Sequence, residues 1–345
     1  MRGEVVTESE LLDAARQGDE DAYAALVSEH RPALHAHCYR MLGSVPDAED
    51  ALQEALLRAW RGLPRFEGRS SLRTWLYTIA TNACLKAIER RPTRVLPVDY
   101  GPGGDPHRDL DEPQVESVWL EPYPDERLVT GDQPPDARYE QRESVELAFV
   151  AALQHLPARQ RAVLILRDVL GFSGGEVAEA LEMSPASVYS ALQRAHRTVE
   201  GRLPAQSQQA ALRSISDERL RTLVGRYIDA WERADVDTLV DLLTEDATIA
   251  MPPYRTWFAG RDAVAAFLRR SPLRSRRWRI LPGHANGQVA FACYLVSEET
   301  GVYEWHSIEL ITLRGDRIAA ITAFLDPDSY RVFGFPATVA GPDPR

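Results

Sequence analysis

The chain has 345 residues, of which 44% are hydrophobic and 26% are charged, and its formal net charge is −11. This length allows two or three domains of globular composition. No apolar run approaches the ~18 residues of a membrane span, and neither a signal-peptide pattern nor the cysteine spacing of a zinc site or disulfide framework is present. We therefore expect a cytoplasmic protein without a membrane segment or a metal, and the acidic charge argues against general coating of nucleic acid.

The charge is distributed unevenly along the chain. Residues 8–53 hold 3 basic and 10 acidic side chains, residues 54–91 hold 8 and 3, and residues 92–136 hold 3 and 11. A basic block between two acidic blocks predicts one local site for a polyanion.

Helical periodicity dominates residues 8–91. Ser44 can cap a helix whose inner stripe consists of alanines and leucines. The opposite face of this helix is polar and charged, and taken alone it indicates only a solvated surface. Its outward side chains are Asp50, Gln53, Glu54, Arg58 and Arg61.

Residues 67–91 predict a second helix with a buried stripe of leucine, isoleucine and alanine. Trp75, Asn82 and Lys86 lie along one border of this stripe at i, i+7 and i+11, with arginines before and after them. Aromatic rings stack on bases, amides read base edges and cations bind phosphates, so this border suits single-stranded nucleic acid. The alternative is that Trp75 belongs to the core.

Residues 92–136 have a different character. Their nine prolines, four glycines and eleven acidic residues are typical of a linker. The stretch VWLEPYPDERL at 118–128 is too apolar and aromatic for a spacer, and we predict that it packs against a neighbouring domain.

Helical periodicity returns over residues 137–203. Ser173 and Glu176 form a capping box that begins one helix, and Ser184 with Pro185 begins another after a tight turn. The second helix has an apolar stripe and leaves Ser, Tyr, Gln and Arg side chains outside it. This pattern predicts a helix-turn-helix that binds duplex DNA, and the alternative is a helical hairpin that only packs.

Residues 204–213 are predicted as a short second linker, and an α+β pattern follows from Ser216. Helices are expected near 217–233 and 235–244, and Gly315–Asp316 predicts a hairpin turn. The predicted strands are 246–251, 276–283, 287–297, 302–313 and 317–325.

Two motifs in this order resemble the sigma-70 family of bacterial RNA polymerase sigma factors, in its small extracytoplasmic-function group. D-A-E-D-x-x-Q-E-x-x-x-x-A-W with F-x-G-R-S-S-L-R-T-W-L-Y-x-I-A-x-N-x-C is similar to sigma region 2. The helix-turn-helix, preceded by L-P-A-R-Q-R-A-V-L-I-L-R-D-V at 156–169, is similar to region 4. The resemblance implies region 2 at 8–91, a linker at 92–136 and region 4 at 137–203.

The resemblance also implies roles for individual residues. The surface that binds the clamp helices of the largest polymerase subunit corresponds to Asp47, Asp50, Gln53 and Glu54. The part that opens and reads the −10 element as a single strand corresponds to Arg69, Arg73, Trp75, Tyr77, Asn82, Lys86 and Arg90. The −35 set is Ser184, Ser187, Tyr189, Ser190, Gln193, Arg194 and Arg197, with a tyrosine at 189 where the family often has Lys or Arg.

Residues 216–328, followed by a tail at 329–345, resemble the SnoaL-like, NTF2-like α+β cone. WLEPYP at 119–124 and FLDPDSYRVFGF at 324–335 resemble motifs of sigma factors that carry such a cone, which implies an in-chain regulator. Related cones include enzymes in which Asp or His moves a proton. The candidates for that role are Asp235, Asp246, His284, His306 and Asp326, and the first two are also explained as a helix cap and a helix end.

We therefore expect a multidomain sigma factor, with all-α regions 2 and 4 followed by an α+β cone. Its expected partners are promoter DNA and core RNA polymerase, through the clamp helices and the flap, with no membrane partner, catalytic residue, metal or cofactor. The competing hypothesis is a bifunctional protein whose cone binds or converts a small molecule, and a ligand of the cone stays open. A classical dimeric repressor is disfavoured because it would not need residues 44–91.

Overall fold

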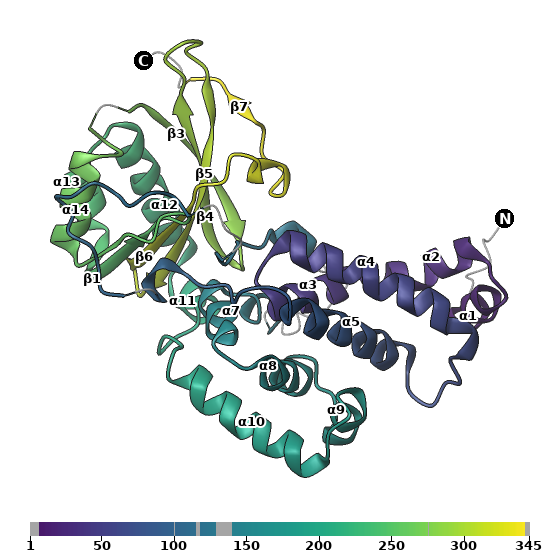
Figure 1. The fold of residues 1–345 in the computed structure, drawn as a ribbon. Coiled ribbons are helices and arrows are strands. Elements are labelled where there is room, and N and C mark those ends of the chain that lie inside the picture. The colour runs from purple at the N-terminus through teal and green to yellow at the C-terminus, as the bar shows by residue number, and fades with distance from the viewer. Residues whose placement is uncertain (1–6, 100, 115–117, 129–139, 275, 342–345) are drawn as a thin grey trace. The chain divides into compact units, whose positions relative to one another are not determined.

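The computed structural model describes residues 7–99, 101–114, 118–128, 140–274 and 276–341, and the chain divides into two compact units (Figure 1). The first unit comprises Met1–Thr93 and Arg127–Arg202 and is helical, whereas the second comprises Arg94–Glu126 and Leu203–Arg345 and contains a sheet. Within the described ranges, no helix is long and apolar enough to cross a membrane.

The first half of the helical unit is built from helices whose N-termini are capped by side chains. Thr7 and Glu10 form a capping box, and the Ser44 and Ser71 hydroxyls accept main-chain hydrogen bonds at the starts of α4 and α5, which confirms the predicted Ser44 cap. The elements are α1 (Glu8–Arg16), α2 (Glu20–Ser28), α3 (Arg31–Leu42), α4 (Val45–Gly62), η1 (Leu63–Arg65) and α5 (Leu72–Ile88).

The second half of the helical unit contains the predicted helix-turn-helix. The Ser173–Glu176 capping box begins α9, and Ser184 caps α10 with Pro185 in its first turn, as expected. Alanines and valines of α10 form its buried stripe, and Leu192 lies at the edge. The elements are α7 (Leu147–Gln154), α8 (Ala158–Leu164), the π-helical turn η4 (Ile165–Val169), α9 (Gly174–Ala180) and α10 (Pro185–Glu200).

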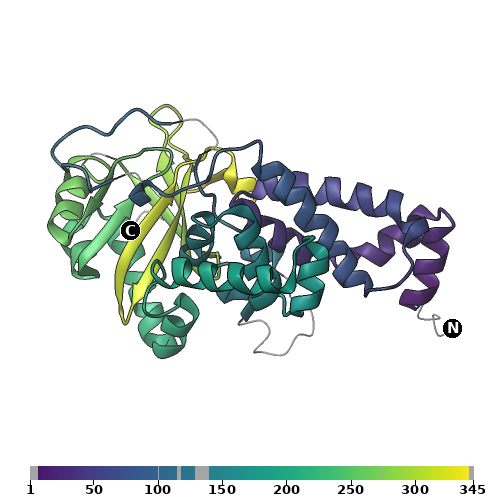
Figure 2. The ribbon, with the colours of Figure 1, turned by 60° about the horizontal axis from the view of Figure 1, so that its bottom comes forward.

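The second unit is a sheet with helices packed on one face, as Figure 1 and Figure 2 show. The strand order is β2-β1-β6-β5-β4-β3, β1 and β6 are parallel, and β7 pairs with β5. The strands are β1 (Leu243–Ala250), β2 (Trp257–Ala259), β3 (Trp278–Ala285), β4 (Gln288–Val296), β5 (Tyr303–Arg314), β6 (Arg317–Phe324) and β7 (Thr338–Val339). The helices are η2 (Pro97–Asp99), η3 (Asp125–Arg127), α11 (Gln208–Ser214), α12 (Asp217–Glu232), α13 (Val236–Asp241), α14 (Arg261–Arg270) and η5 (Ser329–Arg331).

Aromatic side chains fill the space between the helices and the inner face of the sheet. Tyr227 of α12 stacks on Phe291 of β4 with ring centroids 4.5 Å apart, and Phe258 of β2 stacks on Phe267 of α14 at 4.6 Å. All four rings are almost completely buried, so they contribute a large share of the hydrophobic stabilisation of this unit.

The chain after β6 packs on the other face of the sheet. Trp305 of β5 lies 5.9 Å from the ring of Phe335 and donates Nε1–H to Asp326 O over 2.8 Å. A Cβ at Gly283 of β3 would lie 2.7 Å from Phe335 Cζ, so a larger residue at this position would displace the ring. The predicted cone is therefore closed on its outer side by the C-terminal tail.

The structure corrects two sequence predictions in the second unit. Residues 204–213 were expected as a linker but contain most of α11, whose Gln208 is buried and exchanges hydrogen bonds with Leu313 of β5 at 3.0 and 2.6 Å. Asp246 was expected at a helix end but lies within strand β1. The short strands β2 and β7 were not predicted.

Candidate polymerase and promoter interface

The outward face of α4 presents three of the four side chains assigned to the polymerase. Asp50, Gln53 and Glu54 are exposed, and Gln53 Nε2 donates to Glu49 Oε1 over 2.9 Å. Arg58 Nε donates to Glu54 Oε1 over 2.7 Å, and this hydrogen bond and the charge of Arg58 hold the pKa of Glu54 below its usual value. These side chains form an ordered acidic surface along one helix.

Asp47, the fourth assigned residue, lies in a different environment. Its side chain is largely buried, and its carboxylate pairs with Arg91 beyond the end of α5. Arg91 also approaches Asp50 Oδ2 at 3.6 Å. In this structure the Asp47 carboxylate therefore joins α4 to the residues that follow α5.

A groove of about 320 Å³ separates the acids of α4 from the bases of α5. Asn82 and Lys86 on α5 and Arg90 just after it, all assigned to the −10 element, are exposed, and Lys86 and Arg90 line the groove. Arg69 is exposed before the helix and pairs with Glu67 at 2.5 Å. The groove is lined by Asp47, Asp50, Ala51, Glu54, Arg58, Ala83, Lys86, Ala87, Arg90 and Arg91.

Trp75 and Tyr77, also assigned to the −10 element, are less accessible. Trp75 is half-buried and packs on Phe66 with ring centroids 4.8 Å apart. Tyr77 is 3% exposed, and burial raises the pKa of its hydroxyl. Tyr77 meets the ring of Phe172 edge-on at 5.6 Å.

Contacts with the helix-turn-helix half also occupy Arg73. Its guanidinium lies 4.8 Å from the Phe172 ring centroid and donates to Leu170 O over 3.1 Å, and the neighbouring Thr74 hydroxyl donates to Glu176 Oε1 over 3.2 Å. Arg73 is nevertheless exposed, whereas Tyr77 is buried between α5 and Phe172.

The exposed face of α10 carries the whole −35 set. Tyr189 is 63% exposed, and its hydroxyl accepts a 3.0 Å hydrogen bond from Gln193 Nε2. All seven side chains of the set are exposed and project from one short turn and helix, as reading base edges requires. They are Ser184, Ser187, Tyr189, Ser190, Gln193, Arg194 and Arg197.

The sequence analysis missed a hydrogen bond beside this face. His196 Nε2 of α10 lies 2.5 Å from Asp168 Oδ2 of the π-helical turn η4. The two residues are 28 positions apart in the sequence, so no local pattern indicates that they lie close together in the fold.

The five proton-transfer candidates in the sheet unit are scattered and form no Asp–His pair among themselves. Asp235 is the N-cap of α13, as expected, and accepts from Thr238 N and Oγ1 over 3.0 and 2.7 Å. Asp246 pairs with Arg314, His284 and Asp326 are exposed, and His306 lies edge-on to Trp278. Burial lowers the pKa of His306 to about 4.

The carboxyl group inside the cone is Glu309 of β5, which the sequence analysis did not select. It is 4% exposed and accepts a 2.7 Å hydrogen bond from the Tyr227 hydroxyl. Burial raises the pKa of Glu309 to about 7. The sequence did contain a signal of this buried acid. Side chains alternate between the two faces of a strand, so Glu309 shares the apolar face of Ile311 and Leu313.

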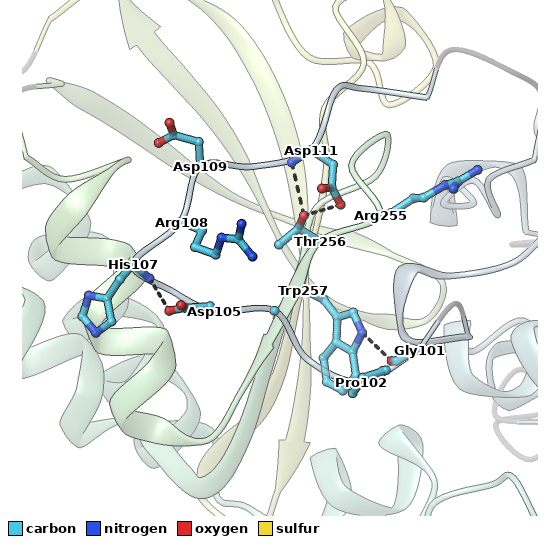
Figure 3. A pocket seen from close by; sticks show the side chains of 11 residues that line it. Gly101, Pro102, Asp105, His107, Arg108, Asp109, Asp111, Arg255, Thr256 and Trp257 are labelled. Atoms are coloured by element: carbon cyan, nitrogen blue, oxygen red, sulfur yellow. Dashed lines mark hydrogen bonds between the residues drawn. The ribbon is translucent and has the colours of Figure 1, made fainter.

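An open pocket of about 850 Å³ lies where residues 101–111 cross the edge of the sheet near β2. In Figure 3, the Trp257 indole donates to Gly101 O over 3.0 Å, and the Thr256 hydroxyl donates to Asp111 Oδ2 over 2.7 Å. Both acidic and basic side chains line this pocket, so its charge does not favour a ligand of one sign. Among the described residues, no group of three His, Cys, Asp or Glu side chains is placed to hold a metal ion.

Family models match three parts of the chain. Sigma-70 region 2 matches residues 26–93, sigma-70 region 4 matches residues 146–199, and a SnoaL-like domain matches residues 224–321. The helical unit and the sheet unit are therefore those of a sigma-70-type factor with a C-terminal SnoaL-like domain.

Individual relatives define the family more closely. ECF RNA polymerase sigma factor SigG of Mycobacterium tuberculosis is 43% identical over 325 residues, which cover 93% of this chain and 85% of the relative. ECF RNA polymerase sigma factor SigW of Bacillus subtilis is 29% identical over 194 residues, 56% of this chain and 94% of the relative. The crystal structure of M. tuberculosis SigJ, an extracytoplasmic-function sigma factor, shares the fold over 90% of this chain and 99% of its own, with a TM-score of 0.54 and 24% identity. The chain belongs to the extracytoplasmic-function (ECF) RNA polymerase sigma factors.

Proposed function

We propose that this sigma factor binds core RNA polymerase through α4, opens and reads the −10 element along α5, and reads the −35 element with α10. One observation carries the proposal: exposed acids of α4 and exposed bases of α5 line one groove, in a chain that also exposes seven polar side chains around α10. We also assign the SnoaL-like domain a modulating role in promoter-directed transcription.

Run-off transcription with core RNA polymerase and a promoter library tests this function. The full-length chain should yield specific transcripts, and Glu54→Lys on the exposed face of α4 should abolish them together with polymerase binding. Glu29→Lys makes the same charge change on an exposed residue at the end of α2 and should leave both intact. No transcript and no polymerase binding from the wild-type chain would overturn the proposal.

The full-length chain is the appropriate protein for this test. A chain ending at Pro204 would lack the sheet unit, to which residues 94–126 belong. It would lack Asn286, the hydrogen-bond partner of the completely buried Tyr123, and its behaviour would mix loss of regulation with loss of structure.

A second candidate function, binding or conversion of a small molecule by the cone, draws on the buried pair of Tyr227 and Glu309. A buried carboxyl with a raised pKa is typical of acid–base sites. A small molecule that enters the cone should raise the melting temperature of the wild-type protein and not that of Glu309→Gln. A ligand screen without such a shift would count against this candidate.

A further inference from the structure

The second unit contains a dense group of arginines in a chain whose formal net charge is −11. Residues 269–279 hold six arginines, and no acidic residue occurs between Asp262 and Glu298. The group begins in the last turn of α14, continues through the connection to β3 and ends in β3 (Figure 1). Such a density of one sign is typical of a surface that binds a polyanion, unless internal ion pairs neutralise it.

Internal ion pairs account for half of these arginines. Three guanidinium groups lie 2.5 to 2.9 Å from a carboxylate oxygen. The pairs are Arg269–Asp237, Arg270–Asp109 and Arg279–Glu232. Arg269 and Arg270 also lie in the last turn of α14, where a cation interacts favourably with the helix dipole. These three side chains therefore stabilise the fold and need no partner outside the chain.

The other three arginines, Arg274, Arg276 and Arg277, form what we call the arginine cluster. All three are exposed, and none forms an ion pair within the described ranges. The neighbouring end of β4 leads into two exposed acids, Glu298 and Glu299, and neither of these pairs with the cluster in the described structure. The cluster therefore presents three positive charges to a partner outside the chain.

Buried side chains anchor the main chain on both sides of the arginine cluster. Leu273 and Trp278 are 5% and 4% exposed, and the Trp278 ring meets that of Trp231 edge-on at 5.5 Å. Trp278 Nε1 donates to Pro272 O over 2.7 Å. At the start of β3, the main chain of the cluster accepts a 3.0 Å hydrogen bond from Val296 N. The three charges therefore project from a connection that is fixed to the core of the unit at both ends.

The acidic segment between regions 2 and 4 is the part of this chain best suited to cover the arginine cluster from within. The segment packs on the second unit, because Leu120 and Tyr123 are completely buried, and the predicted packing is confirmed for residues 118–126. The turn between β3 and β4 anchors it, because Asn286 N donates to Tyr123 O over 2.8 Å and Tyr123 N donates to Asn286 Oδ1 over 2.7 Å. Of the six arginines, only Arg270 pairs with the segment in the described part of the chain.

The chemistry of the arginine cluster fits the phosphate backbone of duplex DNA. Guanidinium groups bind phosphate oxygens in a bidentate manner. The neighbouring Trp278 ring is buried, so it gives the cluster no stacking surface, and single-stranded nucleic acid is bound largely through such surfaces. The chain also keeps duplex DNA close, because only residues 201–207 separate α10 from α11 of the second unit. A connection of this length spans at most about 30 Å.

We propose that the arginine cluster is a further DNA-binding site of this sigma factor, on its SnoaL-like domain, and that it holds the phosphate backbone of the duplex beside the −35 element. This inference rests on the proposed reading of the −35 element by α10. Phosphate contacts add affinity without base preference, and salt weakens them. Three such contacts add about −2.7 to the slope of log K against log salt concentration.

The test measures how tightly the full-length chain, bound to core polymerase, holds a duplex that carries the −35 element and its flanks. The cluster variant combines Arg274→Ala, Arg276→Ala and Arg277→Ala. Its salt slope should be shallower by about 2.7, so the wild type should lose about 40-fold more affinity than the variant when the salt concentration rises about fourfold. Lysine at the same three positions keeps the charges and should restore the wild-type slope.

The matched control removes three arginines from another surface of the same unit. It combines Arg219→Ala, Arg221→Ala and Arg226→Ala, on exposed residues of α12 that are interspersed with acids. The control makes the same change in net charge and should keep the wild-type slope. A hydroxyl-radical footprint of the wild type should extend beyond the −35 element, and the cluster variant should lose that extension.

Several results would overturn the inference. One is an unchanged slope in the cluster variant, and another is an equal loss of slope in the control. A cluster variant that keeps the duplex slope but binds core polymerase or single-stranded RNA more weakly would also overturn it, because the cluster would then have a different partner. A wild-type holoenzyme without preference for the −35 duplex would instead contradict the proposed function, so the two failures are distinguishable.

Discussion

Replacing Glu309 with glutamine tests the interior of the cone through its pH dependence. The carboxyl of Glu309 is almost completely buried against Tyr227, and burial raises its pKa from 4.5 to about 7. Glutamine keeps an oxygen that accepts from the Tyr227 hydroxyl but does not titrate. The variant therefore removes one proton-binding site and leaves the packing in place.

The sign follows from proton binding in the two states. Below pH 4.5 the group is protonated in both the folded and the unfolded chain, and between pH 4.5 and 7 only the folded chain retains the proton. The stabilisation is therefore complete at low pH and is lost as the pH rises through 7. Its total is ~3 kcal/mol for a carboxyl whose pKa is raised from 4.5 to about 7. About 2.5 kcal/mol of this change falls between pH 5 and pH 8.

Hydrogen exchange of β5 peptides, corrected for the intrinsic pH dependence, gives the opening free energy of the cone. The difference between wild type and Glu309→Gln should fall by about 2.5 kcal/mol from pH 5 to pH 8. His306 is present in both proteins and cancels in this difference, and Glu304→Gln, on an exposed residue of the same strand, should give a flat difference. A flat difference for Glu309→Gln as well would refute the protonated buried carboxyl.

Three further changes are predicted. Trp75→Ala with Asn82→Ala should spare polymerase binding but abolish promoter opening, seen as loss of permanganate reactivity at −10 thymines, and normal reactivity would contradict their assignment. Arg194→Ala should lower the salt slope of duplex −35 binding by about one, and an unchanged slope would exclude a phosphate contact there. Gly283→Ala should displace the ring of Phe335, weaken tail docking by ~1 kcal/mol and speed exchange at residues 333–339, whereas unchanged protection would show that the ring moves without cost.

Local patterns account for the parts of the fold that the sequence predicted. Capping residues at Ser44, Ser173 and Ser184 mark helix starts, and apolar alternation marks the four strands β3 to β6 within two residues at each end. Such patterns depend on neighbours a few residues away. They do not report the parallel pairing of β1 with β6. Nor do they report α11, whose buried glutamines have partners in β5 and in the turn between β3 and β4.

The candidate site residues also divide into those that a local pattern predicts and those whose environment depends on distant parts of the chain. The α10 face was predictable because one side of the helix packs and the other is exposed. On α5, Leu72, Leu76 and Ala83 form the expected buried stripe, but Tyr77 and Cys84 are buried as well. A helix covered on two sides has no single apolar face, so the periodicity did not report the burial of Tyr77, which only the family resemblance assigned to the −10 set.

The anchoring turn at Asn286 lies 163 residues after its partner Tyr123 in the chain. A ribosome adding about 5–20 residues per second needs roughly 10–30 s to cover that distance. In the second half of this interval, once residue 203 has been added, both DNA-binding regions have been synthesised while the turn that holds their connection has not. Each newly made molecule therefore passes through a period in which regions 2 and 4 are joined by an undocked chain, and completion of the β3–β4 hairpin ends that period.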